Sequence, residues 1–263
     1  MIPLMTTPPA PSSRLCSPAE LMAELDLHKV LAVSAHPDDI DFGSAATIAA
    51  LTDADVEVSL CMLTTGDAGG FDPGRNAEET SRLRQAEQEA AADVVGISEV
   101  LVLDERDGFV QPTHKLVGDL VRVMRQTRPQ AVLSFHPERA WDRLQKAHPD
   151  HLATGEAVVR AAYPYVENPF AYPELEAAGL PAFKIQHLLL MGSPAERVNL
   201  RVDVTGYQDR KLAALGRHFS QHRDAERMRE FVTDQLQTTH GAGGYAEEFH
   251  HVIVNDPATI SGF

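Results

Sequence analysis

The chain has 263 residues, a hydrophobic content of 43% and a formal net charge of −15. That length suffices for one large α/β domain with a substantial core, and no linker-like stretch divides it. The acidic balance disfavours binding to nucleic acid or to an anionic membrane, since both require a basic surface. The 2 cysteines lie far apart in the sequence, so neither a disulfide framework nor a cysteine-based zinc site is expected.

The N-terminal stretch is expected to be a flexible arm on a single domain. Residues 1–17 are rich in proline, serine and threonine, which opposes regular structure, so the domain is taken to span 18–263. The arm lacks the apolar core of a signal peptide, and no apolar run approaches the ~20 residues of a membrane-spanning helix. We therefore expect a cytoplasmic protein without membrane insertion, and a homo-oligomer stays open.

Strands alternate with helices along most of the chain. This alternation predicts a Rossmann-like α/β fold, with a mostly parallel sheet, helices on both faces and a site at the carboxyl ends of the strands. No G-x-G-x-x-G follows the first strand, so the usual dinucleotide fingerprint is absent. The expected strands are 30–35, 56–63, 99–103, 131–135, 184–191, 200–204 and 245–254, and the expected helices are 18–27, 43–51, 78–95, 112–127, 149–163 and segments between 205 and 238.

Three connecting segments are expected to shape access to the site. They are 66–77, 136–147 and 164–183, and all follow or flank elements that carry polar clusters. Connecting segments at such places commonly carry binding residues. The last one is rich in proline, tyrosine and glutamate and is expected to be a long surface excursion.

A polar cluster follows directly on the first predicted strand. His36-Pro37-Asp38-Asp39 places one imidazole and two carboxylates in four consecutive residues. His36 and Asp39, on a turn that Pro37 restrains, can both face one metal ion. Asp38 would then lie beside the ion without binding it, which suits a base acting on a metal-bound water. The alternative is a solvated turn at a strand end, where proline and aspartate are common.

A second polar cluster, His148-Pro149-Asp150-His151, begins a predicted helix more than a hundred residues later. Its histidines are one helical turn apart, and Asp150 could orient one of them by hydrogen bonding. Taken alone, the cluster is equally a capped helix start with an accidental pair of histidines. Brought together, the two clusters supply a histidine, an aspartate and a histidine. Three protein ligands with water in the fourth position are typical of a catalytic zinc site.

The chain resembles the PIG-L/LmbE-like family of zinc-dependent N-deacetylases over roughly residues 28–250. Members of that family act mainly on N-acetylglucosamine-type conjugates, including those of mycothiol synthesis. The resemblance implies a hydrolase that removes an acetyl or other N-acyl group from a small conjugate with one zinc ion and an activated water. It rests on Ala35-His-Pro-Asp-Asp39, His148-Pro-Asp-His151, the Thr65-Gly-Asp67 turn and the stretch Val202-Asp-Val-Thr205…Lys211…His218-Phe-Ser-Gln221.

The same resemblance implies roles for individual residues. Two positions depart from the family pattern: Ile40 stands where a glutamate is frequent, and Lys146 where some relatives carry a tyrosine. The implied zinc ligands are His36, Asp39 and His151; the implied catalytic residues are Asp38 as general base, His148 at the developing oxyanion and Asp150 holding His148; the implied substrate contacts are Arg84, Asp67 and Lys146.

Two other functions stay open at this point. The enzyme could cleave a larger amide, such as a thiol S-conjugate, or the chain could be a catalytically idle binding relative. The presence of every ligand and of the base opposes the idle relative. The expected partner is a small N-acetylated molecule.

Overall fold

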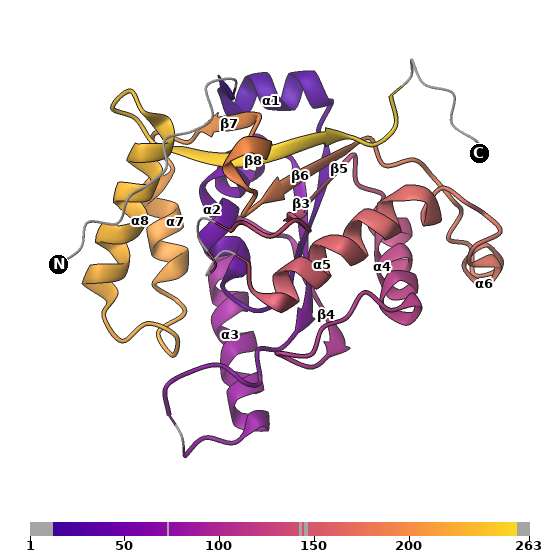
Figure 1. The fold of residues 1–263 in the computed structure, drawn as a ribbon, viewed down its shortest axis with the longest axis horizontal. Coiled ribbons are helices and arrows are strands. Elements are labelled where there is room, and N and C mark those ends of the chain that lie inside the picture. The colour runs from indigo at the N-terminus through magenta and orange to yellow at the C-terminus, as the bar shows by residue number, and fades with distance from the viewer. Residues whose placement is uncertain (1–12, 73, 142–143, 145–146, 257–263) are drawn as a thin grey trace.

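The computed structural model describes residues 13–72, 74–141, 144 and 147–256. Within these residues, the fold is built on one eight-stranded sheet in the order β1-β7-β8-β6-β5-β2-β3-β4 (Figure 1). Only β8 runs antiparallel to its described neighbours, β6 and β7, so the predicted mostly parallel sheet is confirmed. The strands are β1 Arg14–Cys16, β2 Lys29–Ser34, β3 Glu57–Thr64, β4 Glu99–Glu105, β5 Ala131–Phe135, β6 His187–Met191, β7 Leu200–Asp203 and β8 Ala246–Ile253.

Helices cover both faces of the sheet because successive side chains of its central strands point to opposite faces. In β2, Val30 and Ala32 pack into one apolar core, whereas Leu31 and Val33 pack into a second. A strand buried on both faces explains the unbroken apolar run in the sequence. The helices are α1 Pro18–Leu25, α2 Asp39–Thr52, α3 Ala77–Val95, α4 His114–Thr127, α5 Pro149–Arg160, α6 Pro173–Ala177, α7 Gln208–Leu215 and α8 Ala225–His240, with a π-helical turn at Ala161–Tyr165 and a 3-10 turn at Ala195–Arg197.

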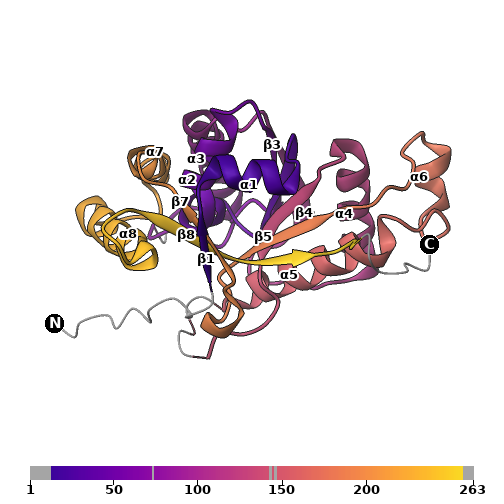
Figure 2. The ribbon, with the colours of Figure 1, turned by 90° about the horizontal axis from the view of Figure 1, so that it is seen from above.

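The direction of sheet growth changes at β2. After β2 the chain forms β3 and β4 on one side, and it then crosses to β5 and β6 on the other. Figure 2 shows α1 and α3 on one side of the sheet and α5 on the opposite side. The segments that leave β2 and β5 therefore diverge, and such a divergence creates a crevice at the carboxyl edge of the sheet. Both polar clusters follow these two strands.

Helix ends are set by local sequence where caps are present. At the start of α3, Asn76 Oδ1 accepts a hydrogen bond from the Glu79 N–H, and the Glu79 carboxylate accepts one from the Asn76 N–H. At its end, Gly96 takes a φ of 82°, a left-handed conformation that glycine adopts without steric cost. The predicted helix 78–95 is therefore found within one residue of its expected bounds.

Two segments differ from expectation near the N-terminus. Arg14–Cys16, assigned to the flexible arm, forms β1 and pairs in parallel with β7. Residues 1–12 lie outside the described residues. The helix expected from residue 43 begins at Asp39, so a predicted metal ligand is its first helical residue.

The predicted surface excursion at 164–183 is more closely packed than its composition suggests. It contains α6, in which Leu175 is 1% exposed. Arg125, at the end of α4, is buried and donates hydrogen bonds to the carbonyl oxygens of Val166, Asn168 and Leu180. A guanidinium with several donors can anchor irregular backbone in this way. The sequence did not show this anchor because an arginine in a last helical turn normally faces water.

The helices are short or carry many charges. Among the described residues the longest is α3, with 19 residues, and its sequence includes both acidic and basic side chains. No helix in the described part of the chain is long and apolar enough to cross a bilayer.

A histidine pair joins β6 to β8. His251 Nε2 lies 3.1 Å from His187 Nδ1, and both rings are half-buried. Burial, and then the neighbouring His187, lowers the pKa of His251 to about 4. Burial also lowers the pKa of His187. Both imidazoles are therefore neutral in the folded protein at neutral pH.

We expect the free energy of unfolding to fall as the pH drops from about 6.5 toward 4. In that range the unfolded chain binds a proton at His251 that the folded chain does not, so acid favours unfolding. The loss is of the order of 1 kcal/mol once solvent screening of a half-buried group is included. Urea denaturation at pH 7.5 and pH 5 should show a smaller loss for His251→Gln than for the wild type. His28→Gln, an exposed control, should behave as the wild type; an equal loss in all three would contradict this assignment.

Candidate active site

The two polar clusters meet at the carboxyl edge of the sheet. His36 follows β2, Asp39 begins α2, and His148 is the N-cap of α5. The rings of His36 and His151 have centroids 5.4 Å apart, and those of His36 and His148 are 5.1 Å apart. Residues more than a hundred positions apart in the sequence are therefore neighbours in space.

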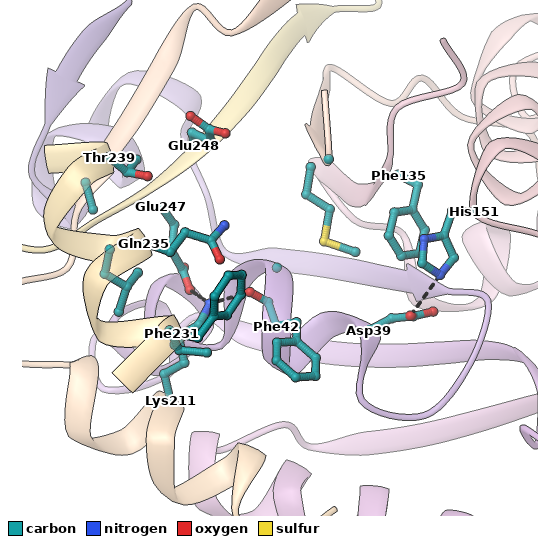
Figure 3. A pocket seen from close by; sticks show the side chains of 16 residues that line it. Asp39, Phe42, Phe135, His151, Lys211, Phe231, Gln235, Thr239, Glu247 and Glu248 are labelled. Atoms are coloured by element: carbon teal, nitrogen blue, oxygen red, sulfur yellow. Dashed lines mark hydrogen bonds and ion pairs between the residues drawn. The ribbon is translucent and has the colours of Figure 1, made fainter. Parts of the chain in front are cut away.

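Asp39 contacts one histidine of each polar cluster. Its Oδ1 is 3.0 Å from His151 Nε2, a contact marked by a dashed line in Figure 3, and its Oδ2 is 3.4 Å from His36 Nδ1. Two ligands on a tetrahedral zinc ion, each roughly 2.0–2.1 Å from it, lie about 3.3–3.4 Å apart. The His36 N–H also donates to Asp39 Oδ2 at 2.7 Å, which fixes the carboxylate within its own turn. Each of the two imidazole contacts is close to this ligand spacing, and they are made by different oxygens of Asp39.

Several carboxylates concentrate negative charge around His36. Asp107 Oδ1 and Asp150 Oδ2 lie 3.1 Å and 3.0 Å from its Nε2, while Asp39 lies on its Nδ1 side. Burial opposes protonation of His36, but hydrogen bonds to Asp107 and Asp39 outweigh it and raise the pKa to about 11. Burial acts to raise the pKa of Asp39, but the neighbouring imidazoles of His151 and His36 outweigh it and lower that pKa. Surroundings that favour a proton on a buried imidazole also favour a metal cation.

The Asp150 carboxylate contacts His36, and its expected role of holding His148 stays a prediction. Its carboxylate lies 3.0 Å from His36 Nε2 and accepts a hydrogen bond from the Gly108 N–H at 2.6 Å. The Val110 N–H, also in the segment after β4, donates to the same carboxylate at 3.3 Å. With Nε2 occupied by Asp150, His36 is left with Nδ1 facing Asp39. A carboxylate that orients a metal-binding imidazole is a common feature of metal sites.

His148 is positioned by a backbone group. The Asp150 N–H donates to His148 Nδ1 at 3.2 Å. Burial, and then the neighbouring His151 and His36, lowers the pKa of His148, so the ring is neutral at pH 7. A neutral imidazole that accepts at Nδ1 carries its proton on Nε2, and that N–H can donate to an oxyanion. His36, His148 and His151 also offer ligand atoms within 4.8 Å of one another, which makes His148 a rival to Asp39 as the third ligand.

Asp38 stands beside the cluster in an uncommon backbone conformation. Its φ of 82° and ψ of −22° lie in the left-handed region, which costs a non-glycine residue on the order of 1 kcal/mol. Burial, and then the charge of Asp39, raises the pKa of Asp38, while Arg84 partly opposes the shift. A carboxyl group with a raised pKa beside a metal site is suited to accepting and returning a proton.

Gln88 holds the Asp38 turn from α3. Its Oε1 accepts from the Asp38 N–H at 2.8 Å, and its Nε2 donates to Asp41 Oδ2 at 2.9 Å. The same oxygen of Asp41 lies 2.8 Å from His218 Nε2, and both of these side chains are fully buried. The buried hydrogen bonds thus connect the turn to α3 and to the segment after α7.

Arg84 closes the turn on its other side. Its guanidinium donates to the carbonyl oxygens of Pro37 at 2.8 Å and Gly66 at 3.0 Å, and it lies 3.5 Å from Asp38 Oδ2. A side chain at Gly66, which has a φ of +69°, would meet the guanidinium at 2.3 Å, so the glycine turn after β3 permits this approach. Arg84 is 4% exposed, which makes it a support for the turn, and its contact with a substrate stays a prediction.

The other two predicted substrate contacts are Asp67 and Lys146. Asp67 is half-buried, and its Oδ1 accepts from the Asp107 N–H at 3.1 Å. Lys146 lies outside the described residues. Asp107 itself was missed by the sequence analysis, although its position just after β4, at the same edge of the sheet as His36, was a usable signal.

A cavity of about 320 Å³ opens beside Asp39 and His151. It extends from these two side chains past Phe135 toward α8, where Phe231 and Gln235 line its other end (Figure 3). Its remaining walls come mainly from α2, the end of β6 and the start of β8. The site therefore has an apolar compartment on the α8 side and a polar network on the α3 side.

Comparisons with known proteins agree with this geometry. Residues 31–162 match the protein family described as PIG-L, GlcNAc-PI de-N-acetylase. The diacetylchitobiose deacetylase of Thermococcus kodakarensis is 29% identical over 206 residues, which cover 74% of this chain and 71% of the relative. The probable N-acetyl-alpha-D-glucosaminyl L-malate deacetylase 2 of Bacillus anthracis is 33% identical over 199 residues, which cover 73% of this chain and 80% of the relative.

A solved structure shows the same fold. The N,N'-diacetylchitobiose deacetylase from Pyrococcus horikoshii, complexed with its inhibitor, superposes with a TM-score of 0.80 at 27% sequence identity. The match covers 87% of this chain and 85% of that chain. The similarity thus extends well beyond the two polar clusters.

Replacing Gln88 by leucine is expected to lower the free energy of unfolding by about 1–3 kcal/mol. The change leaves the Asp38 N–H without its acceptor and removes one donor from Asp41 inside the protein, and unpaired buried polar groups carry this cost. Urea denaturation measures the effect. Gln85→Leu, half-buried on the same helix, is the matched control. Equal stabilities of the two variants would show that Gln88 does not hold the turn.

Proposed function

The chain belongs to the PIG-L family of de-N-acetylases, and on this basis we propose that it is a zinc-dependent hydrolase of N-acylated amino sugars or related small conjugates. The observation that carries the proposal is the position of Asp39, 3.0 Å from His151 Nε2 and 3.4 Å from His36 Nδ1. Asp38 adjoins this group of donors. Two imidazoles and a carboxylate with a second carboxylate beside them are the elements of a metal-assisted hydrolase.

The proposed metal ligands are His36, Asp39 and His151. When bound, a zinc ion there would polarise the amide carbonyl and lower the pKa of a water toward ~7. Asp150 and Asp107 would hold the imidazole of His36 from its Nε2 side, which keeps Nδ1 available as a ligand.

The chain's own residues would carry the proton transfers. Asp38 would accept a proton from the attacking water and return it to the amine as the C–N bond breaks. His148 would donate its Nε2–H to the oxyanion that develops on the carbonyl oxygen. Gln88 and Arg84 would keep Asp38 in its strained conformation, so the carboxylate need not reorganise during the reaction.

The relatives support a small N-acetylated substrate. Two of them are described as a diacetylchitobiose deacetylase and a probable N-acetyl-alpha-D-glucosaminyl L-malate deacetylase, so both act on acetylated amino sugars by their names. The direct experiment is a panel of N-acetylated amino sugars and their conjugates, with amine and acetate release measured together. Zinc-dependent release of both products supports the proposal, and the absence of release from every substrate argues against it.

The adjacent aspartates are expected to separate metal binding from proton transfer. Asp38→Ala should retain zinc and lose kcat by about 10²–10⁴-fold, since general-base catalysis contributes that much. Asp39→Ala should lose zinc together with activity, because a ligand is removed. Metal analysis after dialysis, with kcat measured in parallel, distinguishes the two variants. Zinc loss in Asp38→Ala alone would reverse the two roles, and zinc loss in both would make Asp38 a ligand too.

His148 is expected to affect the rate without affecting the metal. His148→Ala should keep stoichiometric zinc while kcat falls by about 10²–10³-fold, the usual cost of removing one oxyanion donor. His148→Gln, which retains an N–H donor, should recover part of that rate. Loss of zinc from His148→Ala with zinc retained in Asp39→Ala would favour the three-histidine ligand set.

A further inference from the structure

The cavity beside the metal-binding residues is larger and more apolar than an acetyl group requires. Its volume is about 320 Å³. A group the size of one water molecule takes roughly 30 Å³ in a condensed phase, so an acetyl methyl would fill only a small part of the space. Its apolar wall residues include Phe42, Phe135, Met191, Val232 and Leu236.

The position of the cavity indicates which end of the amide it receives. Asp39 and His151 form part of its wall, whereas Asp38 and His148 are not among its described lining residues. The amine must face Asp38, because Asp38 is the proposed proton donor to it. Of the two sides of the scissile bond, the cavity therefore faces the acyl side.

Two charged groups of the cavity wall, Lys211 and Glu247, are paired with each other. Lys211 Nζ lies 2.6 Å from Glu247 Oε1 and donates to the Phe42 carbonyl oxygen at 2.6 Å. The two charged side chains are 3% and 2% exposed, and a dashed line joins them in Figure 3. The Glu247 carboxylate also accepts from the N–H groups of Ala46 and Thr47 in α2. This ion pair is thus part of the protein framework and offers no free charge to a sugar or an acid.

The inner wall can adapt to a flexible chain. Gly43 lies directly against Met191: a Cβ atom at position 43 would be only 2.0 Å from the Met191 sulfur. Because Gly43 has no side chain, the Met191 thioether can pack against α2 and form part of the cavity wall. Methionine has several rotatable bonds and fits irregular apolar ligands well.

We infer that this cavity binds an aliphatic N-acyl chain, so that the preferred substrates carry a linear acyl group of roughly six to ten carbons. The inference rests on the proposed function and defines the acyl side of its substrate. The reaction breaks the amide C–N bond; the oxygen of water goes to the released fatty acid, and a proton goes to the amine. Each methylene of the chain that enters the cavity leaves water, which stabilises the bound substrate.

A series of glucosamine substrates with N-acyl groups of increasing length tests the inference on the zinc-loaded full chain. The substrates carry N-acetyl, N-butanoyl, N-hexanoyl or N-octanoyl groups, and amine release gives kcat/KM for each. We expect kcat/KM to rise at least about tenfold from N-acetyl to N-octanoyl, since an apolar pocket discriminates by added methylene groups. A fall in kcat/KM with chain length would overturn the inference while leaving the deacetylase proposal intact.

Two tryptophan variants on α8 test whether the dependence of kcat/KM on acyl-chain length arises in this cavity. Gln235 is half-buried and lines the cavity, so Gln235→Trp should fill it and reduce the octanoyl-to-acetyl ratio of kcat/KM at least about tenfold. Gln237 is exposed on the same helix and lies outside the cavity wall, so Gln237→Trp should keep the wild-type ratio. Thermal melts establish that both variants fold. An unchanged ratio in a folded Gln235→Trp would overturn the inference.

A binding measurement separates this inference from the proposed function if no substrate is hydrolysed. Isothermal titration with octanoate and with acetate probes the cavity directly. Tighter binding of octanoate than of acetate by the wild type and by Gln237→Trp, with the difference lost in Gln235→Trp, supports an acyl-chain site even then. Equal or absent binding of the two acids overturns it.

Discussion

The concentration of carboxylates at the end of β2 is the constraint on which the rest of the site depends. Asp39, Asp107 and Asp150 all lie within 3.4 Å of an imidazole nitrogen of His36. Asp38 and Asp41 add two more acidic side chains on the same turn and helix. Such a group is stable inside a protein only if donors and cations surround it. The list of those partners describes most of the site: backbone N–H groups after β4, the Gln88 amide, the Arg84 guanidinium, the His218 imidazole and the metal ion that we propose.

These partners come from elements on different sides of the sheet, which explains why the site lies where the direction of sheet growth changes. α3 contributes Arg84 and Gln88, and α5 contributes Asp150 and His151. The two helices pack on opposite faces of the sheet (Figure 2). Side chains from helices on both faces can reach the turn after β2 because this turn lies at the carboxyl edge of the sheet. His36 is part of this turn.

The two sides of the turn differ in chemistry. On the α3 side, a hydrogen bond from the Asp38 N–H to Gln88 supports the left-handed conformation of Asp38, the proposed proton acceptor. On the α8 side, apolar walls begin directly at Asp39 and His151. An amide that lies across the turn would therefore place its amine in polar surroundings and its acyl group in apolar ones. The opposite orientation would place polar sugar groups against the apolar side chains of Phe135 and Met191, which is unfavourable.

The sequence by itself determined most of the strands and helices, the mostly parallel sheet and the two polar clusters, because each depends on residues close together in the chain. Apolar runs, caps and turn residues are local, so the bounds of α3 were predicted within one residue. Local pattern did not identify Asp107 as part of the site, the attachment of Asp150 to His36, the burial of Arg125 or the cavity beside α8. These depend on which segments the tertiary structure brings together. The Asp150 carboxylate contacts His36 and accepts from N–H groups of the segment after β4, some forty positions earlier in the chain, and only the packed fold decides those contacts.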